Sequence, residues 1–415
     1  MKLKYLLGSL AVVLLLSGCN DDKTEGPRLY ALYGDYSSTK VFKIDTREMK
    51  DVATLDVSPA QGPYGVECDS KTEAFALTRR GESIAVINFR TNKVVDVIPL
   101  RFKPRSTATL PGLDLVLVSG KSKPMAVTIG KRDHKVRRYY GIDTDEGVDK
   151  LHYFGGGNAT GHPFWLADGH RFLLLDRVHR KIFLFDKDDE TPLNSIDTET
   201  TAHHVLTLKS EYDVNGNGDY YVVLEGPKDA NDSAIPAAGI MKLRIDAQNG
   251  MQIVKIFHAD HASGGAHHAG FYADRYLFLP TYNKKVYVVD KETMEKVAEF
   301  PAGLGGGHIT FSPKKKIAVV TNHKDTFVTI VDIKDPTHPQ VIENVEVAKP
   351  LTDEEREAGK NAQSHTSHFD DSGRYFYSVA NCDHKFYELD TEYGWISRTC
   401  HLDGNYIPMG DFVRY

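Results

Sequence analysis

The sequence is poor in the motifs that mark several common classes of protein. Its 415 residues include four cysteines, too few for a disulfide framework. It has no Cys-x-x-Cys-His haem motif, no phosphate-binding glycine loop and no nucleophile elbow. The formal net charge is −6, and it falls to −8 without Lys2 and Lys4, so we expect no nucleic-acid partner. The sequence therefore gives no motif-based support for a c-type haem protein, a P-loop enzyme or an α/β-hydrolase.

The one long apolar run lies at residues 6–16. It follows two lysines and leads into Leu16-Ser17-Gly18-Cys19, which resembles a bacterial lipobox. The run is shorter than the roughly 20 residues that a transmembrane helix needs, so a cleaved signal is favoured over an uncleaved anchor. We predict a lipoprotein signal peptide at residues 1–18 and lipidation of Cys19.

The predicted lipid places the protein in the bacterial cell envelope. We expect residues 19–28 to form a lipidated tether and residues 29–415 to form a single domain that faces the periplasm. The lipid would hold the protein to a membrane, and the sequence leaves open whether this is the inner or the outer one. Cys382 and Cys400 are candidates for a disulfide in an oxidising compartment, which their spacing alone does not decide.

One sequence unit recurs along the domain: an apolar strand that ends in Asp or Asn, a polar turn and a further strand. Val-Phe-Lys-Ile-Asp at 41–45 and Val-Thr-Ile-Val-Asp at 328–332 are two copies. The eight copies end at residues 45, 88, 130, 186, 246, 290, 332 and 390. Short apolar runs with a period near 40 and Gly, Asn and Asp turns predict four-stranded β-propeller blades.

We predict an all-β protein with eight propeller blades, or seven if the weak copy that ends at residue 130 is irregular. The chain begins with the pattern of a middle strand at 29–33 and ends with a lone strand at 406–413. We expect that last strand to pair with the first blade and close the ring, which removes an exposed sheet edge. Thr352 and Glu355 form a capping-box pattern that predicts one short helix.

Histidine is abundant, with 18 residues, and it recurs at one position of the repeat. The residue before the innermost strand of a blade is expected at the mouth of the central channel, and five consecutive blades place histidine there. The predicted metal ligands at this position are His162, His203, His204, His267, His268, His308, His365 and His368. The preferred members are His162, His204, His268, His308 and His365. Arg105 takes the same position in the third blade.

Further histidines are expected close to this ring. His179, His323 and His384 follow the second strand of three of the same blades, in a turn predicted to lie on the same face. The segment with His258, Asp260 and His261 leads into His267 through a Ser-Gly-Gly stretch. It is interpreted either as a mobile transfer loop for a metal or as a solvated loop with incidental histidines.

Neutral imidazole is the commonest ligand of zinc, copper, iron and nickel, so the ring predicts a transition-metal site. Without a metal, the same packed imidazoles would act as a pH switch. A separate segment matches the first half of a calcium loop through Asp213, Asn215, Asn217 and Asp219. The favoured alternative for that segment is a hairpin turn.

The repeats, with Pro104-Arg105 and Phe311-Ser312-Pro313, resemble the YVTN/YncE-type and cytochrome d1-like β-propeller superfamily. Within it, the chain is similar to periplasmic zinc chaperones of the AztD type, which combine an exported propeller, histidine ligands and a mobile His/Asp-rich loop. This resemblance implies zinc as the metal and the periplasmic metal-binding protein of an ABC importer as the partner. The related nitrous oxide and d1 nitrite reductases bind copper and haem, but this chain lacks their electron-entry domains.

Three hypotheses follow for function. The first is a non-enzymatic zinc chaperone or acquisition factor, which an expected lack of carboxylate bases near the ring favours. The second is a redox metalloenzyme that uses copper or iron at the same ring. The third is a metal-free scaffold for protein interactions. Because the first two hypotheses share their ligands, the sequence separates them poorly.

Overall fold

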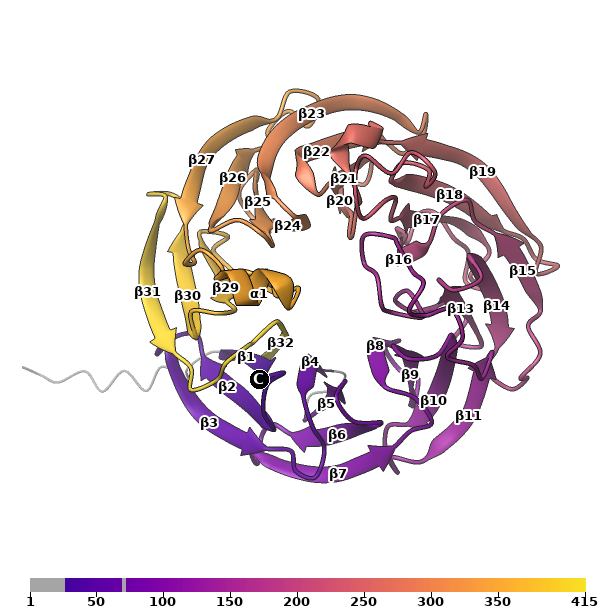
Figure 1. Ribbon diagram of the computed structural model, residues 1–415, viewed down its shortest axis with the longest axis horizontal. Helices are drawn as coiled ribbons and strands as arrows, with labels where there is room; N and C mark the ends of the chain where they lie inside the picture. Colours follow the sequence, from indigo (N-terminus) through magenta and orange to yellow (C-terminus); the bar gives the residue numbers. More distant parts are fainter. Residues whose placement is uncertain (1–26, 69–71) are drawn as a thin grey trace, which may run out of the picture.

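The computed structural model describes residues 27–68 and 72–415, which form eight four-stranded antiparallel sheets arranged in a ring (Figure 1). This confirms the predicted eight-bladed β-propeller and excludes the alternative of seven blades. The predicted signal peptide, Cys19 and residues 20–26 of the tether lie outside the described residues. Among the residues described, no helix is long and apolar enough to span a membrane.

The first four blades follow one another along the chain from the N-terminal side, and the strands of each blade are named from the innermost to the outermost. They consist of β32 (Met409–Arg414), β1 (Leu29–Gly34), β2 (Lys40–Asp45) and β3 (Lys50–Asp56); β4 (Pro63–Cys68), β5 (Glu73–Thr78), β6 (Ser83–Asn88) and β7 (Lys93–Pro99); β8 (Pro104–Thr109), β9 (Leu115–Gly120), β10 (Met125–Gly130) and β11 (Val136–Gly141); and β12 (Phe164–Trp165), β13 (Arg171–Asp176), β14 (Lys181–Asp186) and β15 (Asn194–Asp197).

The remaining blades continue the same order around the ring. They consist of β16 (Ala202–Leu206), β17 (Gly218–Leu224), β18 (Gly239–Ile245) and β19 (Met251–His258); β20 (Gly270–Tyr272), β21 (Tyr276–Pro280), β22 (Asn283–Asp290) and β23 (Glu295–Leu304); β24 (Gly306–Phe311), β25 (Ile317–Asn322), β26 (Phe327–Asp332) and β27 (Gln340–Glu346); and β28 (Gln363–Phe369), β29 (Tyr375–Ala380), β30 (Lys385–Asp390) and β31 (Trp395–His401). The short helices are η1 (His261–Ser263) and α1 (Asp353–Glu357).

The ring closes as predicted, because the last strand of the chain completes the first blade. β32 pairs antiparallel with β1 from Leu29↔Arg414 to Gly34↔Met409. A backbone hydrogen bond from Arg28 N–H to the Tyr415 carbonyl, 3.0 Å long, extends the pairing by one residue. Both ends of the domain are thus fixed in one sheet, and β1 has no open edge.

The core is divided among the contacts between neighbouring blades. Eight clusters of buried apolar side chains are found among the described residues, and each joins two adjacent sheets. Middle strands pack on both faces, so β2 is buried at every position from 41 to 45, whereas the outer strand β3 alternates between exposed and partly buried positions. This explains why the repeat is recognisable as a continuous apolar run rather than an alternating one.

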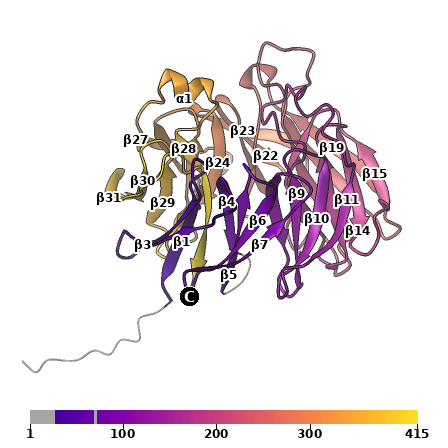
Figure 2. The ribbon, with the colours of Figure 1, turned by 60° about the horizontal axis from the view of Figure 1, so that its bottom comes forward.

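The predicted short helix is present as α1. The Thr352 side chain accepts a hydrogen bond from the Glu355 backbone N–H, and the Glu355 carboxylate accepts one from the Thr352 N–H, which completes a capping box. Figure 2 shows α1 on the face of the ring opposite the C-terminus. The connection between the seventh and eighth blades therefore lies on that face.

Candidate metal centre

Five blades place a histidine at one register of the innermost strand. Each of these histidines lies two residues after the residue that begins pairing with the second strand, which is Thr160, Ala202, Ala266, Gly306 or Gln363. In β16, β24 and β28 the pairing with the second strand of the blade shifts register around this histidine. The five residues at this register are His162, His204, His268, His308 and His365, the predicted set of preferred ligands.

The five rings meet at the axis of the propeller and are joined by three others. The centroid of the His268 ring lies 3.9 Å from that of His308, 4.4 Å from that of His204 and 5.0 Å from that of His162. His203 lies at the start of β16 and His267 lies before β20, and their ring centroids are 4.0 Å apart. The eight members of what we call the histidine cluster are His162, His203, His204, His267, His268, His308, His323 and His365.

The cluster presents ring nitrogens at metal-binding spacing. One ligand atom from each of His267, His268 and His308 lies within 4.8 Å of the others, and His162, His203 and His268 form a second group with the same limit. Four buried ring nitrogens have no hydrogen-bond partner within the described part of the chain. They are Nδ1 of His204, Nδ1 of His267, Nε2 of His308 and Nε2 of His323. Buried polar atoms are almost always paired, so four unpaired nitrogens within one cluster of imidazoles point to a ligand.

Burial keeps these imidazoles neutral, which is the form that binds metals. Removal from water lowers the pKa of His203 to about 3, that of His204 to about 4 and that of His365 to about 3. Burial, followed by repulsion from neighbouring imidazoles, also lowers the pKa of His267 and His268 well below the usual value of 6.5. At neutral pH each ring therefore carries a lone pair, and that of His203 accepts a hydrogen bond from Arg105.

Other side chains orient the ring nitrogens. The Nδ1–H of His203 donates to Oε1 of Glu225 at 2.5 Å, and its Nε2 accepts from Nη2 of Arg105 at 3.1 Å. Glu225 is fully buried and also bound by Arg177, whose charge lowers the Glu225 pKa despite its burial, and hydrogen bonds from His203 and Thr201 lower it further. The hydroxyl of Ser106 lies 2.6 Å from Nδ1 of His162. Such carboxylate–histidine and hydroxyl–histidine pairs fix ligand orientation at metal sites.

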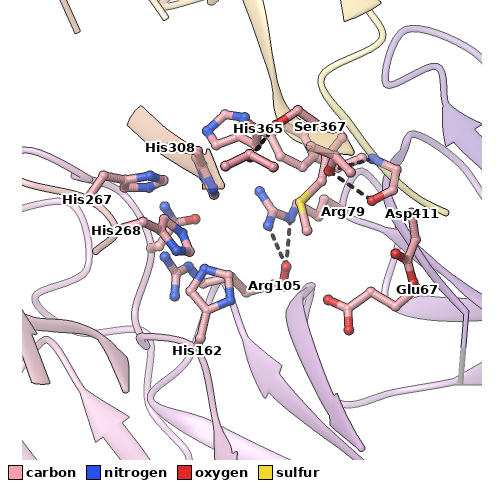
Figure 3. A pocket seen from close by; sticks show the side chains of 16 residues that line it. Glu67, Arg79, Arg105, His162, His267, His268, His308, His365, Ser367 and Asp411 are labelled. Atoms are coloured by element: carbon pink, nitrogen blue, oxygen red, sulfur yellow. Dashed lines mark hydrogen bonds between the residues drawn. The ribbon is translucent and has the colours of Figure 1, made fainter. Parts of the chain in front are cut away.

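Two cavities lie beside the cluster. One, of about 340 Å³, contains Arg79, Arg105, Glu67 and Asp411 in addition to several of the histidines (Figure 3). The other, of about 390 Å³, is lined by Phe154, Lys228, Lys324, His323 and neighbouring residues. His267 and His365 line both cavities, so the cluster can be reached from two sides.

Several predicted site residues lie outside the cluster. His368 stacks on Phe412, with ring centroids 5.0 Å apart, instead of facing the ring. His179 and His384 occupy the predicted turns, but Nδ1 of His179 pairs with Asp176 at 2.7 Å and His384 bonds to the Gly404 carbonyl. Of the three turn histidines, only His323 enters the cluster.

The loop that leads into His267 is anchored by its own contacts. Nε2 of His258 lies 3.2 Å from Glu199, and Asp260 accepts a hydrogen bond from the Tyr287 hydroxyl at 2.8 Å. The ring nitrogens of His261 lie 2.8 and 3.0 Å from the carbonyl oxygens of Ala230 and Ile235. His267 and His268 enter the cluster, and the residues before them remain outside it.

The segment proposed as a calcium loop forms the hairpin before β17. The oxygen atoms that calcium would need are bound by cationic groups: Arg171 donates to Oδ1 of Asn217 and to the Asn215 carbonyl, and Arg244 donates to both oxygens of Asp219. Asp213 accepts the backbone N–H groups of Asn215 and Asn217. Calcium therefore has no part in the function proposed below.

The expectation that no carboxylate lies near the ring is wrong. Oε1 of Glu225 lies 2.5 Å from Nδ1 of His203. Glu67 and Asp411 line the cavity that also contains the histidines. The available signal was a single charged residue directly after an apolar strand, as in Tyr-Tyr-Val-Val-Leu-Glu at 220–225.

Comparisons with known proteins support the fold. No protein-family model matches the sequence, and no curated protein matches it. Among solved structures, the chain is similar to dihydro-haem d1 dehydrogenase NirN in complex with DHE, with a TM-score of 0.61 and 13% identity over 93% of this chain and 74% of that one. It is also similar to apo AztD from Citrobacter koseri, with a TM-score of 0.60 and 12% identity over 94% of this chain and 98% of that one. At identities this low, the TM-scores show a common propeller fold alone.

Proposed function

We propose that this protein binds a transition-metal ion, zinc, at the histidine cluster and acts in its acquisition or transfer. The observation that carries this proposal is the presence of four unpartnered, buried imidazole nitrogens within a cluster built from five consecutive blades. Zinc accepts three or four imidazole ligands, and the group formed by His267, His268 and His308 supplies three within reach of one ion.

The cellular role follows from the two expectations that the sequence raised. A lipid on Cys19 would hold the propeller at a membrane of the bacterial envelope with the cluster in the periplasm. The fold shared with AztD agrees with the expected similarity to zinc chaperones. On this proposal the partner is the periplasmic metal-binding protein of an ABC importer.

Elemental analysis of the purified full chain, exported by its own signal, tests metal binding. We expect about one zinc per chain, and we expect its loss in the variant His268→Ala/His308→Ala. His170→Ala/His338→Ala is the matched control, because both residues are exposed and neither belongs to the cluster. If the protein carries no metal and takes up neither added zinc nor added copper, the proposal is wrong.

A redox centre with copper or iron is the second candidate, and the cavity beside the cluster favours it. An enzyme needs room for a substrate next to the metal, and the cavity of about 340 Å³ places Glu67 and Asp411 near the histidines. Burial raises the pKa of Glu67 to about 7 and that of Asp411 to about 6, values suited to proton transfer at neutral pH. Copper or iron in place of zinc, with a visible absorption band, would support this candidate.

A further inference from the structure

Arg105 is buried beside the histidine cluster with most of its donors unused. It is 2% exposed, and its Nη2 contacts His203. Its Nε and Nη1 are buried without a hydrogen-bond partner in residues 27–68 and 72–415. A guanidinium remains charged in proteins and is costly to bury with unpaired donors. These two nitrogens therefore point to an acceptor group that comes from outside the chain.

The charges around Arg105 favour an anion. Arg79 donates from Nε to the Arg105 carbonyl at 3.1 Å, which adds a second guanidinium to the cavity and fixes the Arg105 backbone. The nearby carboxylate Glu225 is already paired with Arg177 and His203. Figure 3 shows Arg79 between the histidines on one side and Glu67 and Asp411 on the other, and the Arg105 guanidinium lies on the histidine side, against His203. Burial raises the pKa of Glu67 to about 7, so this carboxyl is only about half ionised at neutral pH, whereas Asp411, with a pKa of about 6, is mostly ionised. The two carboxyl groups together therefore offset the two guanidinium groups incompletely.

We propose that this cavity is a binding site for a small oxyanion, of the carboxylate, bicarbonate or phosphate class, held by Arg105 next to the histidine cluster. The cavity of about 340 Å³ is roughly ten times the volume of one liquid water molecule, about 30 Å³, so it admits a small anion with bound water. Thr310 and Ser367 also line it, and because their hydroxyls are hydrogen-bonded to each other at 2.7 Å, one O–H group of the pair is left to donate to a ligand. Oxyanions are the ligands that guanidinium groups bind most strongly.

A bound anion would also lower the electrostatic cost of placing a metal ion beside Arg105. Neutral imidazoles leave the two charges of a zinc ion uncompensated, and the guanidinium of Arg105 would repel that ion. An anion on Arg105 would lie close to both the zinc ion and the guanidinium and would reduce the repulsion between them. The metal and the anion should therefore strengthen each other's binding. The anion site itself rests on Arg105 and does not require the metal.

Calorimetric titration of the metal-free full chain with oxalate, bicarbonate and inorganic phosphate tests the anion site. We expect at least one of the three to bind, and Arg105→Gln to weaken that binding at least tenfold. Arg132→Gln is the matched control, since Arg132 is 87% exposed, and it should leave binding unchanged. The anion that binds identifies its class among the three.

A second variant and a second readout distinguish loss of the anion site from misfolding of the Arg105→Gln variant. Arg105→Lys keeps the charge and should retain part of the affinity, while the ring ¹⁵N signals of His203 should shift on addition of the anion to the wild type. If none of the three anions binds, or if binding is equal in Arg105→Gln, the proposal is overturned. Repeating the titration with zinc separates the two proposals, because anion binding without any zinc uptake refutes only the metal site.

Discussion

Acidification should lower the free energy of unfolding of the metal-free protein more steeply than it would in a protein whose histidines are exposed. The pKa of His203 in the folded protein is about 3, that of His204 about 4 and that of His365 about 3. In the unfolded chain each imidazole has a pKa of about 6.5. Between these values the unfolded state binds protons that the folded state does not, so the free energy of unfolding falls as the pH falls below about 6.5.

The size of the effect follows from the same pKa values. Each group contributes about 1.4 kcal/mol per pH unit within this window. From pH 7 to pH 5 one such histidine costs about 2 kcal/mol, and the three together cost about 6 kcal/mol. A domain has a total stability of about 5–15 kcal/mol, so the metal-free protein should be close to unfolding at pH 5.

Urea unfolding at pH 7, 6 and 5, in the presence of a chelator, measures this dependence. His204→Gln removes one of the titrating groups and should reduce the slope by about one proton. His338→Ala is the control, because this side chain is 78% exposed and should leave the slope unchanged. A free energy of unfolding that is constant between pH 7 and pH 5 would refute the assignment of neutral, buried imidazoles.

Three further predictions concern the support of the site and the ring. Glu225→Gln should lower the free energy of unfolding by about 3–5 kcal/mol in urea, because the fully buried Arg177 loses its counter-charge, and should weaken zinc binding about 10- to 100-fold; a loss under 1 kcal/mol would contradict the first part. Deletion of residues 406–415 removes β32, exposes the edge of β1 and should produce aggregates in size-exclusion chromatography rather than a monomer. Leu173→Ala, at a contact between the fourth and fifth blades, should cost about 2–5 kcal/mol in the same urea assay.

The blade count was predictable because the repeat is fixed by local chemistry. Seven of the eight marker residues end the third strand of a blade, and residue 246 directly follows one. The side chain of Asp45, like that of Asp290, accepts backbone N–H groups from the turn that follows. An Asp or Asn side chain after an apolar strand favours this turn, so seven of the eight blades carry the same local pattern, and the third blade, with Gly130, is the weak copy.

The histidine register was predictable for a similar reason, whereas the contacts of the other site residues were not. Position relative to the innermost strand places His162 and His308 at the axis without knowledge of any contact. The direction of a side chain after a turn depends on its tertiary neighbours, so His323 enters the cluster while His179 pairs with Asp176. Glu225 and Arg177 lie 48 residues apart, and no local pattern indicates that they form a buried pair.

The fold itself does not require imidazole at this register, and this is the strongest argument that the cluster exists for its chemistry. The second and third blades place Gly65 and Ser106 at the position that His204 and His308 occupy, with the same shift in strand pairing. The prediction that Arg105 takes this position in the third blade is therefore wrong by one residue, because pairing there begins at Pro104. Each buried polar group without a partner costs about 1–3 kcal/mol, so the four unpartnered ring nitrogens cost about 4–12 kcal/mol. That is comparable to the whole stability of a domain, and a small side chain at the same register would avoid it. A ligand that binds only the folded protein offsets this cost by mass action. Zinc should therefore raise the stability of the protein most at the pH values where the imidazoles are neutral.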